Sequence, residues 1–425
     1  MTRFVVAVLA GTLSGPVAYG VSPDPKDLVI PPQELSKARE LVRKLGSEFY
    51  KDREEAHAEL AKMGRLARPA LLEAVTTDPD PEVRFRSSLL LPRAAAADLQ
   101  ARLETFLADT DGRFEHDLPG LKYYRKLIGT DKPARDLFVE MVKSPYNVEL
   151  LQTLERSPTD AGRAIADRRN SLYGDMQQRF VPGKPVQPPK QPQLPDIACL
   201  LLAEALTPSR EIPRNALFAY VTGVTFLQLP ASNNALNTPG TPHADAYKRI
   251  VSVWLDSRDD VQDLNQLPYI VGQQLRNLPQ STPLLRRIVT TEGVQGYAKG
   301  QALMYLVQNR QKEEIPFLKS LLKDDSVVTS VWFGGQIPNQ PPVQHQCLLR
   351  DVALALLIQQ TGQKMLDYGF SFPPGLNPEQ AGRQLGYGHY AFVRDEARTA
   401  ALVKFGFWQL KQGLKQPTKT EPQPD

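Results

Sequence analysis

Few residues in this sequence have the spacing of a metal site. His345 and Cys347 are separated by one residue, and imidazole and thiolate groups are both zinc ligands. A closed zinc site takes four ligands, and no second pair follows within the usual reach. The pattern therefore favours a loop histidine before a helix-start cysteine over a zinc site. We predict no metal ion and no cofactor.

Motifs of catalysis are also missing. Ser320 and Lys323 have the Ser-x-x-Lys spacing of some acylating enzymes, but Leu321 and Leu322 between them indicate the amphipathic end of a helix. The sequence has no phosphate loop ending in Gly-Lys-Ser/Thr, no Gly-x-Ser-x-Gly elbow and no His-Glu-x-x-His helix. We therefore assign no catalytic residue.

Two other histidines have ordinary structural interpretations. His116 lies between Glu115 and Asp117, which predicts a solvated turn rather than a catalytic base. His57 lies beside Ala56 and Leu60, which recur at helical spacing, so we expect it to pack on or flank a helix.

Three arginines lie just inside expected helices, at Arg84, Arg350 and Arg394. They could line a groove that binds acidic groups. Each also has acidic residues within a few positions, and helix faces pair oppositely charged residues at that spacing. We favour the second interpretation, in which these arginines pair with nearby acids and join adjacent helices.

Aromatic residues in glycine-bearing segments are the candidate binding residues. Trp332 and Phe333 precede two glycines, and Tyr387, His389 and Tyr390 surround Gly388. Aromatic side chains are enriched at the energetic centres of protein interfaces. The same residues could instead close the end of a stack of helices. We carry them forward as a candidate partner-binding site.

The elements that must position these residues are helical. Leu35, Ala38, Leu41, Val42 and Leu45 recur at the spacing of one helix face. Asp80-Pro81-Glu82 is a typical helix start, with a capping acid, a first-turn proline and an acid near the positive end of the dipole. Further apolar runs follow at 56–63, 71–75, 83–91, 99–107, 118–128, 137–142, 197–206, 247–255, 270–278 and 284–289.

One stretch departs from helical periodicity. Residues 326–333 are rich in β-branched and aromatic side chains and are followed by Gly334-Gly335. We predict a small β-hairpin insertion near 326–346. Residues 224–229 are a weaker strand candidate.

The amino terminus predicts export. Arg3, the apolar run 4–13 and the small-x-small pattern Ala18-Tyr19-Gly20 form the three parts of a signal peptide. The apolar run is too short to span a bilayer, so we expect no transmembrane span in the mature chain.

The sequence has two cysteines. Cys199 lies in an apolar run and is predicted to be a small buried residue, and its pairing with Cys347 stays open.

The net charge of the chain limits the classes of partner that it can bind. The 51 basic and 47 acidic residues leave a formal charge of only +4, and they are spread along the chain. Nucleic-acid binders usually carry a basic stripe, so we expect no nucleic acid partner.

The proline run within 180–195 predicts a semi-extended linker. The predicted organisation is a signal peptide at 1–20, helical regions at 30–179 and 196–412 joined by that linker, and a disordered tail at 413–425.

A weak repeat accompanies the helix starts. Arg53 and Arg84 lie 31 positions apart in similar contexts, and Arg350 and Arg394 lie 44 apart. Residues 54–91 and 296–322 each resemble a HEAT repeat, and the chain is similar to exported bacterial HEAT-repeat proteins of uncharacterised activity. The segment 208–243 departs from this pattern. The resemblance implies an all-α fold, an irregular solenoid of antiparallel helix pairs whose exposed surface holds partners.

These observations favour an exported, non-catalytic protein-interaction scaffold of the bacterial envelope, located in the periplasm or outside the cell. We expect a protein or peptide partner. An enzyme on a HEAT-like scaffold, with scattered residues that form no short motif, is the alternative, followed by a helical-repeat nucleic-acid binder.

Overall fold

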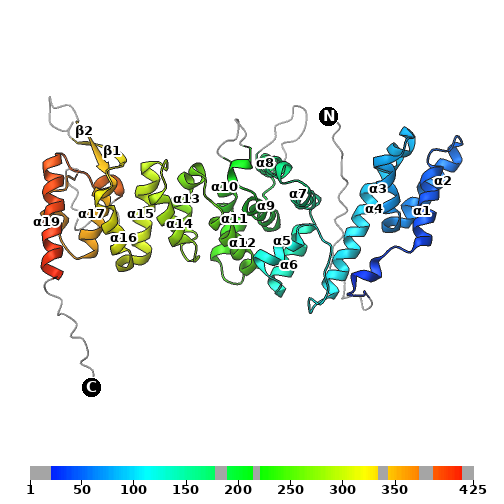
Figure 1. Ribbon diagram of the computed structural model, residues 1–425, viewed down its shortest axis with the longest axis horizontal. Helices are drawn as coiled ribbons and strands as arrows, with labels where there is room; N and C mark the ends of the chain where they lie inside the picture. The colour runs from blue at the N-terminus through cyan, green and yellow to red at the C-terminus, as the bar shows by residue number, and fades with distance from the viewer. Residues whose placement is uncertain (1–20, 178–188, 214–220, 334–342, 373–385, 414–425) are drawn as a thin grey trace, which may run out of the picture. The chain divides into compact units, whose positions relative to one another are not determined.

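The computed structural model describes residues 21–177, 189–213, 221–333, 343–372 and 386–413, and these residues are mainly helical (Figure 1). They include one two-stranded sheet, so the predicted all-α class with a small β-hairpin is confirmed. The chain forms two compact units, Met1–Arg125 and Lys126–Asp425. The predicted signal peptide and residues 414–425 of the predicted tail lie outside the described residues.

The first unit consists of short 3-10 helices (η) and α-helices. In chain order these are η1 (Pro25–Leu28), α1 (Pro32–Lys44), α2 (Tyr50–Met63), η2 (Gly64–Ala67), α3 (Arg68–Thr77), α4 (Pro81–Ala108) and the start of α5 (Leu121–Ile128).

α4 begins at the predicted capping sequence. The Asp80 side chain accepts a hydrogen bond from the Glu82 backbone N–H at 2.9 Å, and Pro81 occupies the first turn. The helix then continues through Pro92 to Ala108. The apolar spacing alone predicts two separate helical runs, at 83–91 and 99–107. Four consecutive alanines after Pro92, the best helix formers, carry the helix across the gap.

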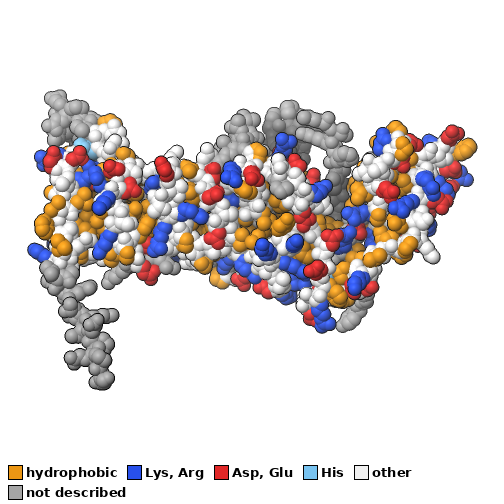
Figure 2. All heavy atoms as spheres, viewed as in Figure 1, with side chains coloured by type: hydrophobic (Ala, Val, Ile, Leu, Met, Phe, Trp, Pro, Cys, Tyr) orange, Lys and Arg blue, Asp and Glu red, His pale blue; other side chains and the backbone are white. Residues whose placement is uncertain are grey.

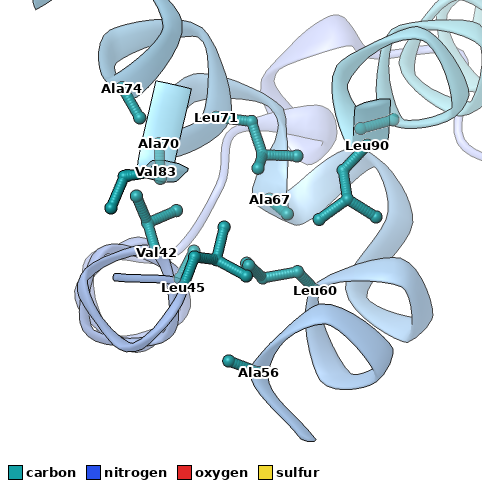
Figure 3. Packing of buried hydrophobic residues seen from close by; sticks show 12 residues of the cluster. Val42, Leu45, Ala56, Leu60, Ala67, Ala70, Leu71, Ala74, Val83 and Leu90 are labelled. Atoms are coloured by element: carbon teal, nitrogen blue, oxygen red, sulfur yellow. The ribbon is translucent and has the colours of Figure 1, made fainter. Parts of the chain in front are cut away.

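Small side chains let the first four α-helices pack closely. α1 contacts α2 and α3, and α4 contacts α2 and α3, around one apolar cluster (Figure 3). Leu71 of α3 is fully buried in this cluster. Leu72, which belongs to the apolar run predicted at 71–75, is 44% exposed and lies outside the cluster. The cluster consists of Ala38, Val42, Leu45, Ala56, Leu60, Ala67, Ala70, Leu71, Ala74, Val83, Leu90 and Ala94.

The second unit holds the remaining elements. They are α6 (Lys132–Val142), α7 (Pro145–Arg156), α8 (Pro158–Met176), α9 (Leu194–Leu206), η3 (Ser209–Glu211), α10 (Gly223–Leu227), α11 (Pro230–Asn237), α12 (Ala244–Asp256), α13 (Val261–Gln273), α14 (Ser281–Thr290), α15 (Gly296–Arg310), η4 (Gln311–Glu314), α16 (Ile315–Ser320), η5 (Leu321–Lys323), β1 (Val327–Phe333), β2 (Val343–Leu348), α17 (Leu349–Gln360), η6 (Met365–Tyr368), η8 (Tyr387–His389) and α19 (Asp395–Gly413).

α9 is the central helix of the first half of this unit. Every side chain from Ile197 to Ala203 is fully buried, because α6, α7 and α8 cover one side and α10, α11 and α12 cover the rest. Helices on both sides of the proline-rich segment 180–195 therefore pack into one unit. The compact units divide between Arg125 and Lys126 instead, and α9 already begins at Leu194.

The second strand candidate is wrong. Residues 223–227 form α10, because Thr222 and Thr225 exchange the hydrogen bonds of a capping box and Phe226 and Leu227 are buried. Farther along the chain, α13, α14 and α15 pack in succession, and α15 contacts α17.

Gly272 allows the closest approach between α13 and α15. A Cβ atom at this position would overlap the root of the Tyr305 ring, which is itself buried. Gly406 in α19 is the opposite case, since a Cβ atom there meets nothing within 4 Å.

We predict that Gly272→Ala lowers the free energy of unfolding by about 1–3 kcal/mol, because the added methyl group overpacks the helix contact. Gly406→Ala is the matched control and should raise it by about 0.5–1 kcal/mol through helix propensity. Urea denaturation followed by circular dichroism measures both. A Gly272 variant as stable as the Gly406 variant would contradict this account.

Candidate functional site

The β-hairpin forms the most exposed part of the candidate site. β1 and β2 pair antiparallel, with Trp332 opposite Gln344 and Ser330 opposite Gln346, and a bulge lies between Val327 and Thr329. These four side chains share one face of the sheet and all are exposed, with Trp332 62% exposed. The outward face is therefore aromatic at one position and neutral and polar around it.

Two glycines of α15 let the hairpin rest directly on that helix. A Cβ atom on Gly296 would overlap the Val327 carbonyl group, and one on Gly300 would lie 2.5 Å from Val328 Cγ1 and 2.9 Å from the Tyr387 ring. The absence of side chains at both positions is what brings β1 and η8 together on α15. The two predicted aromatic segments are thus neighbours in space.

Cys347 joins β2 to the segment around η8. Its thiol donates to the carbonyl oxygen of Tyr390 at 2.9 Å and lies 3.3 Å from that of Tyr387. The side chain is fully buried. Burial, with a smaller contribution from Asp351, raises the pKa of the Cys347 thiol well above its usual range. The group therefore acts as a neutral hydrogen-bond donor in packing.

The other cysteine is equally enclosed. Cys199 in α9 is buried, and desolvation raises the pKa of its thiol to about 12. Both cysteines are free, which answers the question of their pairing. Among the described residues, no group of three or more His, Cys, Asp or Glu side chains could hold a metal ion.

A buried ion pair fixes the hairpin to α17 and α19. Asp351, in the first turn of α17, accepts two hydrogen bonds from Arg398 Nε at 2.9 and 3.1 Å and one from the Leu348 N–H at 3.0 Å. Arg398 also donates to the Gln346 carbonyl oxygen at 3.0 Å and pairs with Asp395. Burial raises the pKa of Asp351, although the Arg398 hydrogen bond acts in the other direction.

The structure separates the five candidate residues. Trp332 is an exposed surface residue, and Tyr387 and His389 are half-buried. The His389 ring turns to its own segment, where Nδ1 accepts from the Gly386 N–H at 3.0 Å. Tyr390 has no exposed surface and receives a hydrogen bond from Gln359 Nε2 at 3.3 Å, so it is a core residue and not a contact for a partner. The Phe333 side chain lies outside the described atoms.

Two tyrosines that the sequence analysis did not single out are exposed on α13 and α15. Tyr297, in the first turn of α15, is 43% exposed and donates to the Asn265 carbonyl oxygen at 3.4 Å. Tyr269 on α13 is 46% exposed, one helical turn after Asn265. Burial, followed by the proximity of Tyr297, raises the pKa of Tyr387. The sequence signal for Tyr297 is its position between Gly296 and Gly300, the two glycines at which β1 and η8 approach α15.

η8 packs on the Thr329 and Cys347 side of the hairpin, so Tyr387 lies across the sheet from Trp332. We call Trp332 with Ser330, Gln344 and Gln346, which share the outward face of the sheet, the aromatic surface.

The arginines at helix starts have partners other than those predicted. Arg84 donates to the carbonyl oxygens of Asp78 and Pro79 at 2.7 and 2.9 Å, and Arg394 is exposed. Pairing with acids is made by Arg86, which bridges Glu82 and Glu54, and by Arg398. Ion pairs with acids are thus made two positions later in one helix and four positions later in the other than predicted.

A second buried ionic cluster lies around Glu204, which has no exposed surface. Its carboxylate accepts from Arg169 Nε at 2.6 Å and from Trp254 Nε1 at 2.7 Å. Arg258 donates to the Glu204 carbonyl oxygen at 2.6 Å and to Asp263 at 3.2 Å. Side chains from α8, α9, α12 and α13 thus satisfy one another, and the arrangement is that of a structural joint between helices.

His116 corrects the prediction of a solvated turn. Its side chain is 2% exposed, and Nε2 lies 3.0 Å from Asp109 Oδ2. Burial opposes ionisation of Asp109, but the His116 contact and the N–H groups of Phe114 and Arg113 together lower its pKa. The pair closes the segment after α4, and the ring packs edge-on against Phe106.

Comparison with known proteins found no matching family model, no similar curated protein and no similar solved structure. A search of the described helices found none long and apolar enough to cross a membrane. The candidate site therefore rests on its own geometry.

We predict that Asp351→Asn lowers the free energy of unfolding by about 3–5 kcal/mol, because it leaves buried Arg398 without its main counter-charge. Asp395→Asn removes a second carboxylate from the same arginine, but this one is 87% exposed, so its effect should be small. Urea denaturation and limited proteolysis measure both variants. Equal stability of the two would show that the buried pair does not hold the hairpin.

Proposed function

We propose that this chain is an exported, non-catalytic scaffold that binds a protein or peptide through the aromatic surface. Exposed Trp332 is the observation that carries the proposal. Trp332 is 62% exposed and pairs with Gln344 of β2, a strand that buried contacts of Cys347 and of the Gln346 carbonyl group hold in place. The backbone that presents the ring is therefore partly fixed before a partner binds.

The neighbourhood of Trp332 favours an uncharged polypeptide as the partner. Ser330, Gln344 and Gln346 surround it on the outward face of the sheet, and their hydroxyl and amide groups can donate and accept hydrogen bonds. An extended segment with aliphatic or proline side chains fits this combination of an aromatic ring and amides.

The distribution of charge supports the same class of partner. Lys and Arg side chains are interspersed with Asp and Glu side chains over the visible face in Figure 2. Formal charges of 51 and 47 nearly cancel. The protein therefore has no strong net field that would steer a highly charged ligand to its surface from a distance.

A HEAT-like helical repeat is part of the proposal, and one repeated contact supports it. Arg53 donates to the carbonyl oxygens six and five residues before it, at 2.7 and 3.2 Å. Arg84 makes the same two contacts, at 2.7 and 2.9 Å. The two arginines are 31 positions apart and each closes the turn before a helix, as expected for successive copies of one structural unit.

We predict that Trp332→Ala weakens binding of a selected peptide roughly tenfold or more, the loss typical of a central interface residue. The peptide is to be selected from a random display library on the immobilised chain, and affinity measured by isothermal titration. Phe85→Ala is the matched control, since Phe85 is 59% exposed on α4 in the other unit. Equal affinities of the wild type and the Trp332 variant for every selected peptide would exclude the aromatic surface as the binding site.

We also predict that the chain expressed with its first 20 residues in a bacterial host is exported and cleaved after Ala18-Tyr19-Gly20. Intact mass measurement of the periplasmic protein locates the new amino terminus. Charge reversal at Arg3 should reduce export, because the leader then loses its positive start. Retention of the full-length chain in the cytoplasm would contradict this part of the proposal.

A further inference from the structure

α19 exposes a long apolar face. Its inner side packs on α17 and η6, with Ala401 and Phe405 almost fully buried. On the other side Val403, Phe407 and Leu410 are 51%, 62% and 66% exposed. Spacings of four and three residues place these side chains on one face of the helix. Three large apolar side chains exposed next to one another on one helix face make this a candidate interaction surface.

Smaller and charged residues complete this face. Ala400 lies one turn before Val403 and two turns before Phe407, and Glu396 and Lys411 lie at the two ends, all of them exposed. We call the set the α19 face, and it consists of Glu396, Ala400, Val403, Phe407, Leu410 and Lys411.

The α19 face is complementary to itself. When two copies are placed antiparallel with Val403 beside the two-fold axis, Phe407 of each copy opposes Ala400 of the other, a large side chain against a small one. Glu396 of each copy then opposes Lys411 of the other, an acid against a base. We infer that α19 pairs with α19 of a second copy of this chain in a two-fold symmetric, antiparallel contact.

The order of charges along α19 selects the antiparallel direction. Asp395 and Glu396 are in its first turn and Lys411 is in its last turn. A parallel pair would place like charges side by side, whereas the antiparallel pair places opposite charges together and opposes the two helix dipoles. A second copy is the occupant that these features fit, because a two-fold interface needs one surface to match itself. The inference does not depend on the proposed binding function.

One helix from each copy gives a small interface, so we expect a reversible dimer with a dissociation constant in the micromolar range. Sedimentation velocity on the full chain over about 1 to about 100 μM should show a concentration-dependent shift from monomer to dimer. Phe407→Asp should abolish the shift while leaving the circular dichroism spectrum unchanged, since the side chain is 62% exposed. A wild-type chain that stays monomeric over this range, or a Phe407→Asp variant that still dimerises, would overturn the inference.

Charge reversal tests the direction of pairing. Glu396→Lys and Lys411→Glu each create two like-charge contacts per dimer, because the symmetry repeats every substitution, and each should weaken the dimer roughly tenfold. The double variant exchanges the two charges and should restore wild-type dimerisation. A double variant no stronger than the single variants would overturn the antiparallel arrangement.

A cysteine at the axis gives an independent readout. Val403→Cys should form an intermolecular disulfide under mild oxidation, because the two Cβ atoms meet beside the axis. The native cysteines are both buried and remain unreactive. Leu89→Cys in α4 is the control, with Leu89 53% exposed against 51% for Val403. Equal cross-linking of the two variants would count against the dimer.

Discussion

The pair between Asp351 and Arg398 determines where both proposed surfaces lie. Asp351 begins α17 and accepts the Leu348 N–H at the end of β2, while Arg398 begins α19 and donates to the Gln346 carbonyl oxygen within β2. One arginine and one aspartate, 47 positions apart in the chain, thus join the end of β2 and the starts of α17 and α19. Because α19 and the hairpin share this joint, the orientation of the α19 face is linked to that of Trp332. A guanidinium group suits the position, since its planar fork can serve a carboxylate and a carbonyl group together.

The same solution recurs elsewhere in the second unit. Glu204 is enclosed by Arg169, Trp254 and Arg258, and Glu314 accepts two hydrogen bonds from Arg286 at 3.0 and 2.8 Å. Taking these charges out of water costs free energy, so such pairs contribute less to net stability than apolar side chains of the same volume would. What they contribute is selection among packings. A helix that slides or rotates against its neighbour leaves a buried carboxylate without its donor, and the cost of that error is large.

Local patterns were predictable from sequence, and distant contacts were not. The hairpin follows from β-branched and aromatic residues in a row, and the start of α4 follows from Asp80-Pro81-Glu82, because each signal lies within a few residues. The burial of His116 depends on Asp109, and that of Tyr390 on a pocket completed by Gln359 and Cys347. Neither contact has a local signature. The choice of Arg398 over Arg394 is of the same kind. Arg394 precedes α19 and is exposed, whereas Arg398 lies in the first turn of α19 and meets Asp351, a residue 47 positions away.

Pairing through α19 would change what the aromatic surface can do. Each dimer would present two copies of that surface, related by the two-fold axis and linked to α19 through the contact of Arg398 with β2. A partner with repeated binding segments, or one that is itself an oligomer, would then meet the second site at a high effective concentration, and its overall affinity would exceed that of a single site without any new contact. A single exposed tryptophan with neutral neighbours gives only modest affinity alone, so dimerisation is the feature that would convert a weak contact into a durable one.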